Sequence, residues 1–181
     1  MKKLRILVSF VALGVAATTL TACDSSVNGD ALPSTPAPSS APTSSPANPF
    51  ASRNQCALLD QILSGKGFPK ATPTEAQAQR SCGSQGGKET NFTAIGLLLQ
   101  EGQRYSDNIR NPSKARSGKL NGRPFVEDPE PLGSSGQCSM FFAVEPNSRA
   151  VLDVTGGTDT AASCRTAEDL ASKLEPLLPK N

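Results

Sequence analysis

Residues 137–155 read QCSMFFAVEPNSRAVLDVT, two apolar runs separated by Pro-Asn-Ser at positions 146–148. Two such runs around a short polar turn predict a β-hairpin. In the second run polar and apolar residues alternate, so one face of the hairpin is expected to be buried and the other to be wet. Val151, Asp153 and Thr155 fall on one face, and Leu152 and Val154 fall on the other.

The adjacent aromatic residues Phe141 and Phe142 should point to opposite faces of the first strand of this hairpin. We expect one of them to face the helices. The other either lies beneath the long segment 100–124 or offers an apolar surface to a lipid or a protein partner. Both residues are therefore candidates for binding.

Apolar residues at helical spacing predict one helix near each end of the domain. Asn54 can cap the first helix, and Gly65 or Gly67 can end it. Its apolar residues are Leu58, Leu59, Ile62 and Leu63. Thr166 is expected to cap the second helix, and Pro176 should kink it or end it near Glu175. Its apolar face consists of Ala167, Leu170, Ala171, Leu174 and Leu178.

Shorter elements complete the expected fold. The sequence TPTE at residues 72–75 matches a capping box with proline at the first helical position, and it predicts a short helix over residues 73–80. Residues 91–99 and 123–126 are predicted strands. Helices at both ends with strands between them indicate an α+β fold, an antiparallel sheet with the N- and C-terminal helices packed on one face.

Four of the five cysteines lie in this domain, at Cys56, Cys82, Cys138 and Cys164. An even number of cysteines in an exported domain is typical of disulfides. Four cysteines allow three pairings, and the equal spacing of 26 residues favours Cys56–Cys82 with Cys138–Cys164. Because there is no Cys-x-x-Cys motif and no close cysteine pair, we expect neither thioredoxin-like chemistry nor a zinc site.

The N-terminus has the pattern of a lipoprotein signal peptide. Lys2, Lys3 and Arg5 precede an apolar run of 15 residues, which suits a signal sequence better than a membrane span. The lipobox LTAC follows and ends at Cys23, so residues 1–22 are expected to be removed and Cys23 to carry a diacylglyceryl group. Two acyl chains are enough for stable anchoring. The predicted location is the extracytoplasmic face of the cell membrane, with the membrane as a partner.

Residues 24–49 contain six prolines, seven serines and no aromatic residue. Such a segment cannot bury enough apolar surface to offset the entropy of ordering it. Residues 23–49 are therefore predicted to form the lipidated start of a disordered tether, and residues 50–181 a single extracytoplasmic domain.

Composition excludes several classes of function. The chain of 181 residues has no His, so it contains no Ser-His-Asp triad and no His-ligated metal or haem. Its net charge is +2, and removal of the signal peptide leaves 15 basic and 16 acidic residues. This balance argues against nucleic acid as a partner. The sequence points to no catalytic residue, no metal and no cofactor.

Two charged clusters are candidates for function. Glu127, Asp128 and Glu130 could supply carboxylates for hydrolysis or for calcium, or could form a solvated turn. Between residues 104 and 123 six basic residues face only Asp107. This segment could meet anionic lipid headgroups or wall polymers, or could be a mobile solvated loop. Its candidate binding residues are Arg110, Lys114, Arg116, Lys119 and Arg123.

Short motifs follow the lipobox and the tether in an order found in a known family. They are CALLD at residues 56–60, NGRP at 121–124 and CRTA at 164–167. In this order the chain resembles a family of actinobacterial lipoproteins known as a domain of unknown function, family three-five-five-eight. The resemblance covers residues 55–179 and implies a secreted, membrane-anchored domain, but it implies no activity. Members often carry Trp two residues after the second cysteine of the domain, where this chain has Ser84.

Together these features predict a lipid-anchored, non-enzymatic domain that binds a lipid, a wall component or a membrane protein. Two alternatives stay open: a carboxylate-dependent envelope hydrolase that uses the acidic cluster, and an accessory subunit of an exported membrane assembly. The sequence leaves the oligomeric state open.

Overall fold

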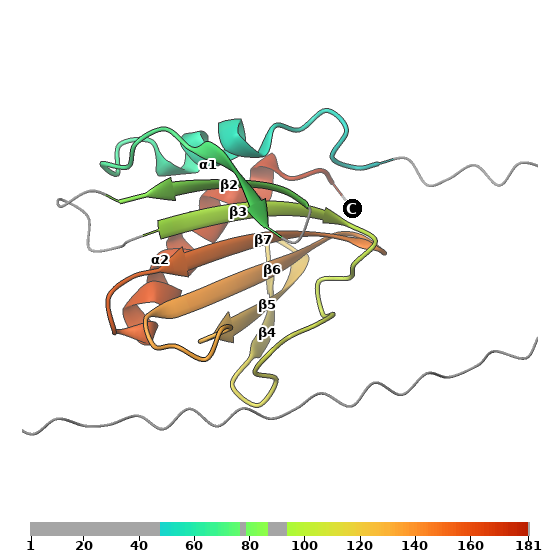
Figure 1. The fold of residues 1–181 in the computed structure, drawn as a ribbon. Helices are drawn as coiled ribbons and strands as arrows, with labels where there is room; N and C mark the ends of the chain where they lie inside the picture. The colour runs from blue at the N-terminus through green and yellow to red at the C-terminus, as the bar shows by residue number, and fades with distance from the viewer. Residues whose placement is uncertain (1–47, 77–78, 87–93, 181) are drawn as a thin grey trace, which may run out of the picture. The chain divides into compact units, whose positions relative to one another are not determined.

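The computed structural model describes residues 48–76, 79–86 and 94–180, which belong to one compact unit (Figure 1). The predicted signal peptide, the lipobox and most of the predicted tether lie outside the described residues. Phe50, the first residue of the predicted domain, is fully buried. Within the described ranges, no helix is both long enough and apolar enough to span a membrane.

The described residues of the domain form seven strands, two α-helices and one 3₁₀ turn. The strands are β1 (Thr72–Ala76), β2 (Gln79–Gln85), β3 (Ala94–Glu101), β4 (Arg116–Leu120), β5 (Arg123–Pro129), β6 (Gln137–Glu145) and β7 (Ser148–Thr155). The helical elements are α1 (Gln55–Leu63), α2 (Thr160–Leu174) and η1 (Glu175–Leu177). Residues 91–93 of the predicted strand 91–99 lie outside the described ranges, and the remainder is β3.

All seven strands form one antiparallel sheet in the order β1-β2-β3-β7-β6-β5-β4 (Figure 1). The predicted hairpin is β6 and β7, and it lies inside the sheet between β5 and β3. Met140 pairs with Leu152, and Phe141 pairs with Val151. The alternation of the second run is confirmed, because Leu152 and Val154 belong to the helix-facing core, whereas Val151 faces the opposite side. The prediction that this opposite face is wet is wrong, because Val151 is buried there in a second apolar cluster.

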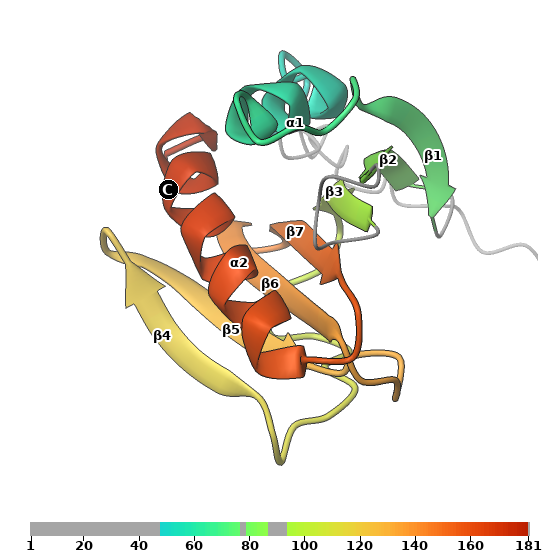
Figure 2. The ribbon, with the colours of Figure 1, turned by 90° about the vertical axis from the view of Figure 1, so that its left-hand side faces the viewer.

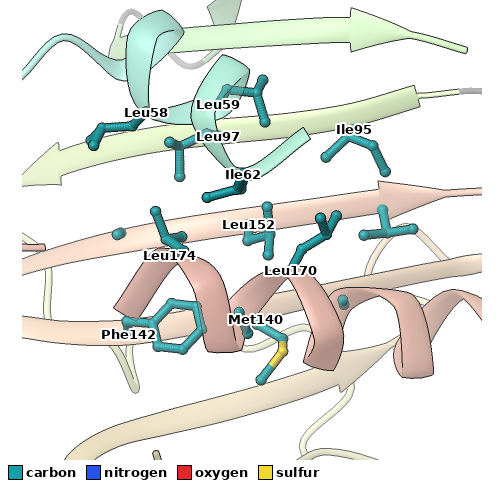
Figure 3. Close-up of a cluster of buried hydrophobic side chains, with 14 of the residues drawn as sticks. Leu58, Leu59, Ile62, Ile95, Leu97, Met140, Phe142, Leu152, Leu170 and Leu174 are labelled. Carbon is teal, nitrogen blue, oxygen red and sulfur yellow. The ribbon is translucent and has the colours of Figure 1, made fainter. Parts of the chain in front are cut away.

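Both helices pack on the same face of the sheet, α1 over β2 and β3 and α2 over β5, β6 and β7 (Figure 2). The predicted α+β architecture is therefore confirmed. The core between the layers is built from apolar side chains of both helices and of the central strands (Figure 3). Its largest fully buried members include Leu59, Ile62, Leu97, Met140, Phe142, Leu152, Leu170 and Leu174.

The opposite face, called here the outer face, is partly covered by residues 102–115. Leu98, Val126, Phe141 and Val151 form a second apolar cluster on this face. Tyr105, Ile109 and Ala115 pack against that cluster from the covering segment. Of the two alternatives for the adjacent aromatics, the structure has the covered one: Phe142 lies in the main core, and Phe141 is buried on the outer face.

Two disulfides fasten the helices to the sheet. Cys56 pairs with Cys82 and joins α1 to β2, and Cys138 pairs with Cys164 and joins β6 to α2. The Cα–Cα distance is 5.1 Å in each pair. The structure therefore has the sequential pairing that the equal spacing favours.

The predicted helix over residues 73–80 is wrong. Residues 72–76 form β1, which pairs with β2 in antiparallel register, and Thr74 Oγ1 and Ser81 Oγ lie 2.9 Å apart across the pair. The capping-box pattern reflects only neighbouring residues. In the folded chain the disulfide at Cys82 holds β2 beneath α1, and β2 pairs with every residue of β1. Tertiary pairing thus overrides the local helix signal.

The C-terminal helix starts six residues before the predicted cap. Asp159, not Thr166, caps α2, and its carboxylate accepts a hydrogen bond from the Ala162 N–H at 3.0 Å. Thr166 lies inside the helix. The predicted end is confirmed, because the α-helix stops at Leu174 and Pro176 lies in the following 3₁₀ turn.

Candidate functional site

A row of three polar residues crosses β7, β6 and β5 on the outer face, and Gly96 of β3 adjoins it. Gly96 of β3 pairs with Asp153 of β7. On its other side Asp153 pairs with Ser139 of β6, which in turn pairs with Asp128 of β5. Directly paired residues project from the same face of a sheet. Asp128 and Asp153 are therefore two strands apart, roughly 10 Å between their Cα atoms at the usual strand spacing.

This polar row forms part of the wall of a pocket of about 510 Å³. The polar lining includes Asp128, Gln137, Ser139, Arg149 and Asp153. Apolar atoms of Phe141, Val151 and Leu98 adjoin them, from the cluster beneath the covering segment. At the mouth lie Arg110 and Leu132, and the side chain of Leu132 is 74 % exposed.

Asp128 is the most deeply buried acid of the pocket, with 0 % exposure. Its Oδ2 atom accepts a hydrogen bond from the backbone N–H of Arg110 at 3.1 Å. Its Oδ1 atom and Gln137 Oε1 are buried, and neither has a hydrogen-bond partner among the described residues. Buried polar atoms without partners are rare in folded proteins because their desolvation is not compensated.

Asp153 has a different environment on the neighbouring strand. Ser139 Oγ donates a hydrogen bond to its Oδ1 atom. Burial raises the pKa of the Asp153 carboxyl above its ordinary value, and the Ser139 hydrogen bond and the charge of Arg149 only partly oppose this. Gly96 on the neighbouring strand β3 has no side chain to contact this carboxylate. A Cβ atom at that position would lie 3.8 Å from Asp153 Oδ2.

Arg149 of β7 holds the covering segment against the outer face. Its Nε donates to Gln100 Oε1 and its Nη2 to Gln103 Oε1, each at 2.6 Å. Its Nη1 donates to the backbone carbonyl of Asp107, also at 2.6 Å. The guanidinium carbon lies 5.0 Å from the centre of the Phe141 ring, within cation–π distance. Burial lowers the pKa of Arg149, with the charges of Asp107 and Asp153 opposing.

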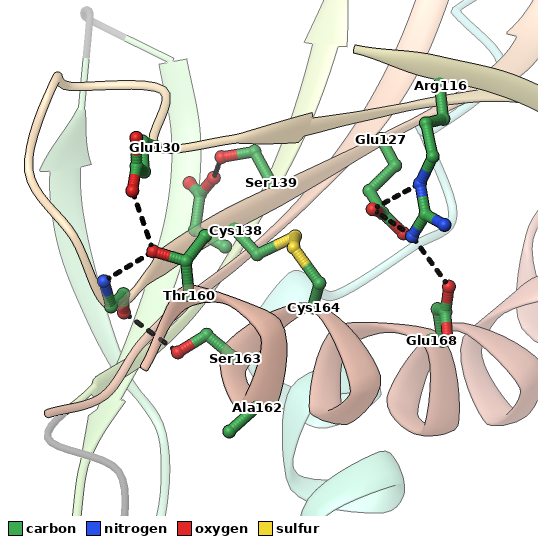
Figure 4. Close-up of a disulfide and its surroundings, with 12 residues drawn as sticks. Arg116, Glu127, Glu130, Cys138, Ser139, Thr160, Ala162, Ser163, Cys164 and Glu168 are labelled. Carbon is green, nitrogen blue, oxygen red and sulfur yellow. Dashed lines mark hydrogen bonds and ion pairs between the residues drawn. A yellow bond between two sulfur atoms is a disulfide. The ribbon is translucent and has the colours of Figure 1, made fainter. Parts of the chain in front are cut away.

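The structure distributes the predicted basic residues instead of gathering them in one patch. Arg116 binds Glu127 at 2.6 Å and Glu168 at 3.3 Å (Figure 4). Lys114 pairs with Glu130 at 2.7 Å.

The remaining three basic residues are also dispersed. Arg123 is buried and pairs with Glu175 at 3.1 Å. Lys119 is exposed on β4, and Arg110 lies at the pocket mouth. The segment is not the solvated loop that its composition suggests, because residues 102–115 cover the outer face and residues 116–120 form a strand.

The acidic cluster is not a solvated turn either. Glu127 and Asp128 belong to β5, and both are buried. Successive strand residues point to opposite faces, so Asp128 lines the pocket whereas Glu127 lies on the helix side. Glu130 lies beyond the strand, where Thr160 Oγ1 donates to it at 2.9 Å (Figure 4). The three carboxylates therefore do not converge on one site.

Glu127 lies beside the Cys138–Cys164 disulfide (Figure 4). Burial raises the pKa of Glu127, its Arg116 partner lowers it, and Glu168 raises it further. One carboxylate oxygen and the two sulfur atoms fall within 4.8 Å of one another, a separation that a metal ion could span. Both sulfur atoms are bonded to each other, so they offer no thiolate ligands.

Sequence reasoning named Asp128 and Phe141 but missed the partners that make the pocket. Asp153 and Ser139 carry no motif, and they meet only because β5, β6 and β7 are in register. A signal was present in the alternation of residues 151–155, which places a carboxylate on the face opposite the core.

No protein-family model, no curated protein and no solved structure matches this chain. The resemblance to the actinobacterial lipoprotein family stays a prediction.

Proposed function

We propose that this chain is a lipid-anchored lipoprotein of the cell envelope whose domain binds a small ligand in the outer-face pocket without transforming it. The observation that carries the binding role is the pair of buried, unpartnered acceptors, Asp128 Oδ1 and Gln137 Oε1, in the lining of that pocket. A ligand that donates hydrogen bonds to both atoms would remove their desolvation cost. The lipobox ending at Cys23 supports the anchored location.

The rigid setting of the pocket supports a binding role. Its polar lining comes from adjacent strands of one sheet, and the sheet is fastened to both helices by disulfides. Arg149 holds the segment that forms part of the wall. A preformed pocket costs less conformational entropy when the ligand binds.

A screen by thermal unfolding tests the binding role. The full chain in mild detergent is mixed with a library of small molecules, and the melting temperature is recorded for each mixture. At least one compound should raise the melting temperature of the wild type, and the rise should be lost in Asp128→Leu. Glu101→Gln, which changes an exposed carboxylate outside the pocket, is the matched control. If every hit stabilises Asp128→Leu as strongly as the wild type, the pocket is not the binding site.

Cell fractionation in an actinobacterial host tests the anchor separately. Cys23→Ala should move the protein from the membrane fraction to the soluble fraction, because no acyl chains are attached. Ser25→Ala, two residues further on, should leave it in the membrane fraction. Equal membrane retention of Cys23→Ala and the wild type would contradict the anchor.

A carboxylate-dependent hydrolase is the second candidate, now with Asp128 and Asp153 in place of the predicted acidic cluster. The favouring observation is that two carboxyl groups line one pocket and burial raises the pKa of one of them, as in a general acid. The two roles differ in the fate of the hit compounds. Binding returns them unchanged after prolonged incubation with the protein, whereas hydrolysis produces fragments that mass spectrometry detects.

A further inference from the structure

We propose that the ligand of the outer-face pocket is an organic monocation, a single protonated amine attached to an apolar body. In this arrangement the ammonium group donates to Asp128 Oδ1 and Gln137 Oε1, and Asp153 supplies a second negative charge. This inference rests on the proposed binding function and specifies its ligand.

The first argument compares the buried carboxylates of the protein. Glu127 pairs with Arg116 at 2.6 Å, and Glu175 pairs with Arg123 at 3.1 Å. Asp128, which is as deeply buried, has no ion-pair partner among the described residues. A buried carboxylate without a counter-charge is costly, and arginines compensate Glu127 and Glu175. The counter-charge that Asp128 lacks is assigned to the ligand.

The second argument is the hydrogen-bond inventory of the pocket. The two buried, unpartnered atoms are both acceptors. The Ser139 hydroxyl donates to Asp153, so its proton is not directed toward a ligand. Three Arg149 nitrogens donate to Gln100, Gln103 and backbone carbonyls of the covering segment. An ammonium group offers three donors and no acceptor, which suits the two unpartnered acceptors, whereas a carboxylate or phosphate placed against those two atoms would face acceptors.

The third argument limits the ligand to one positive charge. Arg110 lines the mouth and Arg149 lines the wall, so a second ammonium group further along a ligand would meet like charges. The remaining wall is apolar, with Leu98, Phe141 and Val151 among its members. A volume of about 510 Å³ is typical of a small-molecule site and accommodates an aryl or alkyl body.

Titration calorimetry with matched probes tests the proposal on the full chain in mild detergent. The probes are 2-phenylethylamine, its neutral analogue 2-phenylethanol, the anion 3-phenylpropanoate, spermidine and calcium chloride. We expect 2-phenylethylamine to bind about tenfold or more tightly than the alcohol, because a charge-assisted hydrogen bond replaces a neutral one. Spermidine should bind more weakly than 2-phenylethylamine, and the anion should not bind.

Substitutions locate the ammonium group. Asp128→Asn and Gln137→Leu should each weaken the binding of 2-phenylethylamine, Asp128→Asn by about tenfold or more. Glu101→Gln should leave the affinity unchanged. Should Asp128→Asn fail to fold, Gln137→Leu locates the ammonium group, and the pH dependence of the wild type supplies a second readout. Because burial raises the pKa of the Asp153 carboxyl, the affinity should rise as the pH is raised through that pKa while the amine stays charged. Asp128 on β5, Asp153 and Arg149 on β7, and Arg110 at the mouth are the charged groups of the site.

The outcomes separate this inference from the function on which it rests. Equal affinities for the amine and the alcohol, or tighter binding of the anion, overturn the cation proposal and leave a binding pocket. Tight calcium binding lost in Asp128→Asn, without amine binding, replaces the amine with a metal ion. If no probe binds and the thermal screen finds no ligand, both the inference and the proposed function fail.

Discussion

At the scale of single residues, the buried carboxyl group of Asp153 in the pocket lowers the stability of the folded protein at neutral pH. Burial raises the pKa of its carboxyl above 3.8, so the charged form is less stable in the folded protein than in the unfolded chain. The contribution of this carboxyl group to the free energy of unfolding is therefore greatest below pH 3.8. It falls as the pH rises through the pKa that the group has in the folded protein. A residue that lowers stability at neutral pH is common at binding sites.

Asp153→Asn should consequently raise the free energy of unfolding at pH 7, because the amide carries no charge and still offers an acceptor to Ser139. The gain should shrink toward zero as the pH is lowered to about 3, where the wild-type carboxyl is protonated in both states. Urea unfolding of both proteins at a series of pH values measures the difference. A difference that does not change with pH would contradict the raised pKa.

Phe141 and Phe142 provide a second comparison between neighbours. Phe142→Ala should lower the free energy of unfolding by about 3–5 kcal/mol, because it leaves a cavity in the main core. Phe141→Ala should cost less, since its ring lies in the smaller outer cluster under residues 102–115. Urea unfolding of the two variants checks the order. Equal losses would show that the outer cluster is packed as strongly as the core.

At the scale of elements, the sequence correctly predicted the helix ends that are set by neighbouring residues. Asn54 caps α1 by accepting from the Ala57 N–H at 3.0 Å, and Pro176 ends α2. Local signals failed at two places where another local arrangement was available. Residues 72–76 form β1 because β2, the next element in the chain, pairs with them, and α2 begins at Thr160 because Asp159 caps it in place of Thr166.

The covering segment is attached to the outer face by both polar and apolar contacts. Arg149 binds it through Gln103 and the Asp107 carbonyl, and Asp128 accepts a hydrogen bond from the Arg110 N–H. Arg149→Lys keeps the charge but loses the planar set of donors, so it cannot bond to both sites at once. We expect faster amide hydrogen exchange in residues 102–110 with little change in α2. Unchanged exchange in this segment would mean that its remaining contacts hold it without Arg149.

Each of the two disulfides attaches one helix to the sheet. Each closes a loop with a sequence separation of 26 residues, which corresponds to roughly 3.5 kcal/mol in the chain-entropy model. Replacing Cys56 and Cys82 by Ala, or Cys138 and Cys164 by Ala, should lower the free energy of unfolding by similar amounts of this order. Urea unfolding of the two double variants measures both. A loss confined to one pair would show that the other helix is held by packing alone.

At the scale of the whole molecule, the sequence predicted the α+β class, both helices and the pairing of cysteines from periodicity and spacing. It did not predict the pocket. Asp128 and Asp153 are 25 positions apart in the chain, and only the register of three strands places them on one face. Two loops, residues 102–115 and 130–136, each contribute lining residues, and their sequences have no period that shows where they fold back.

The central claim, that the outer-face pocket holds a ligand, is tested most directly by native mass spectrometry of the full-length gene product purified from the membranes of an actinobacterial host. The account predicts a bound mass beyond that of the protein itself in the wild type and in Glu101→Gln, and its loss in Asp128→Leu. A bound mass retained by Asp128→Leu, or a wild type with no bound mass either as purified or after incubation with the compounds of the thermal screen, would contradict it.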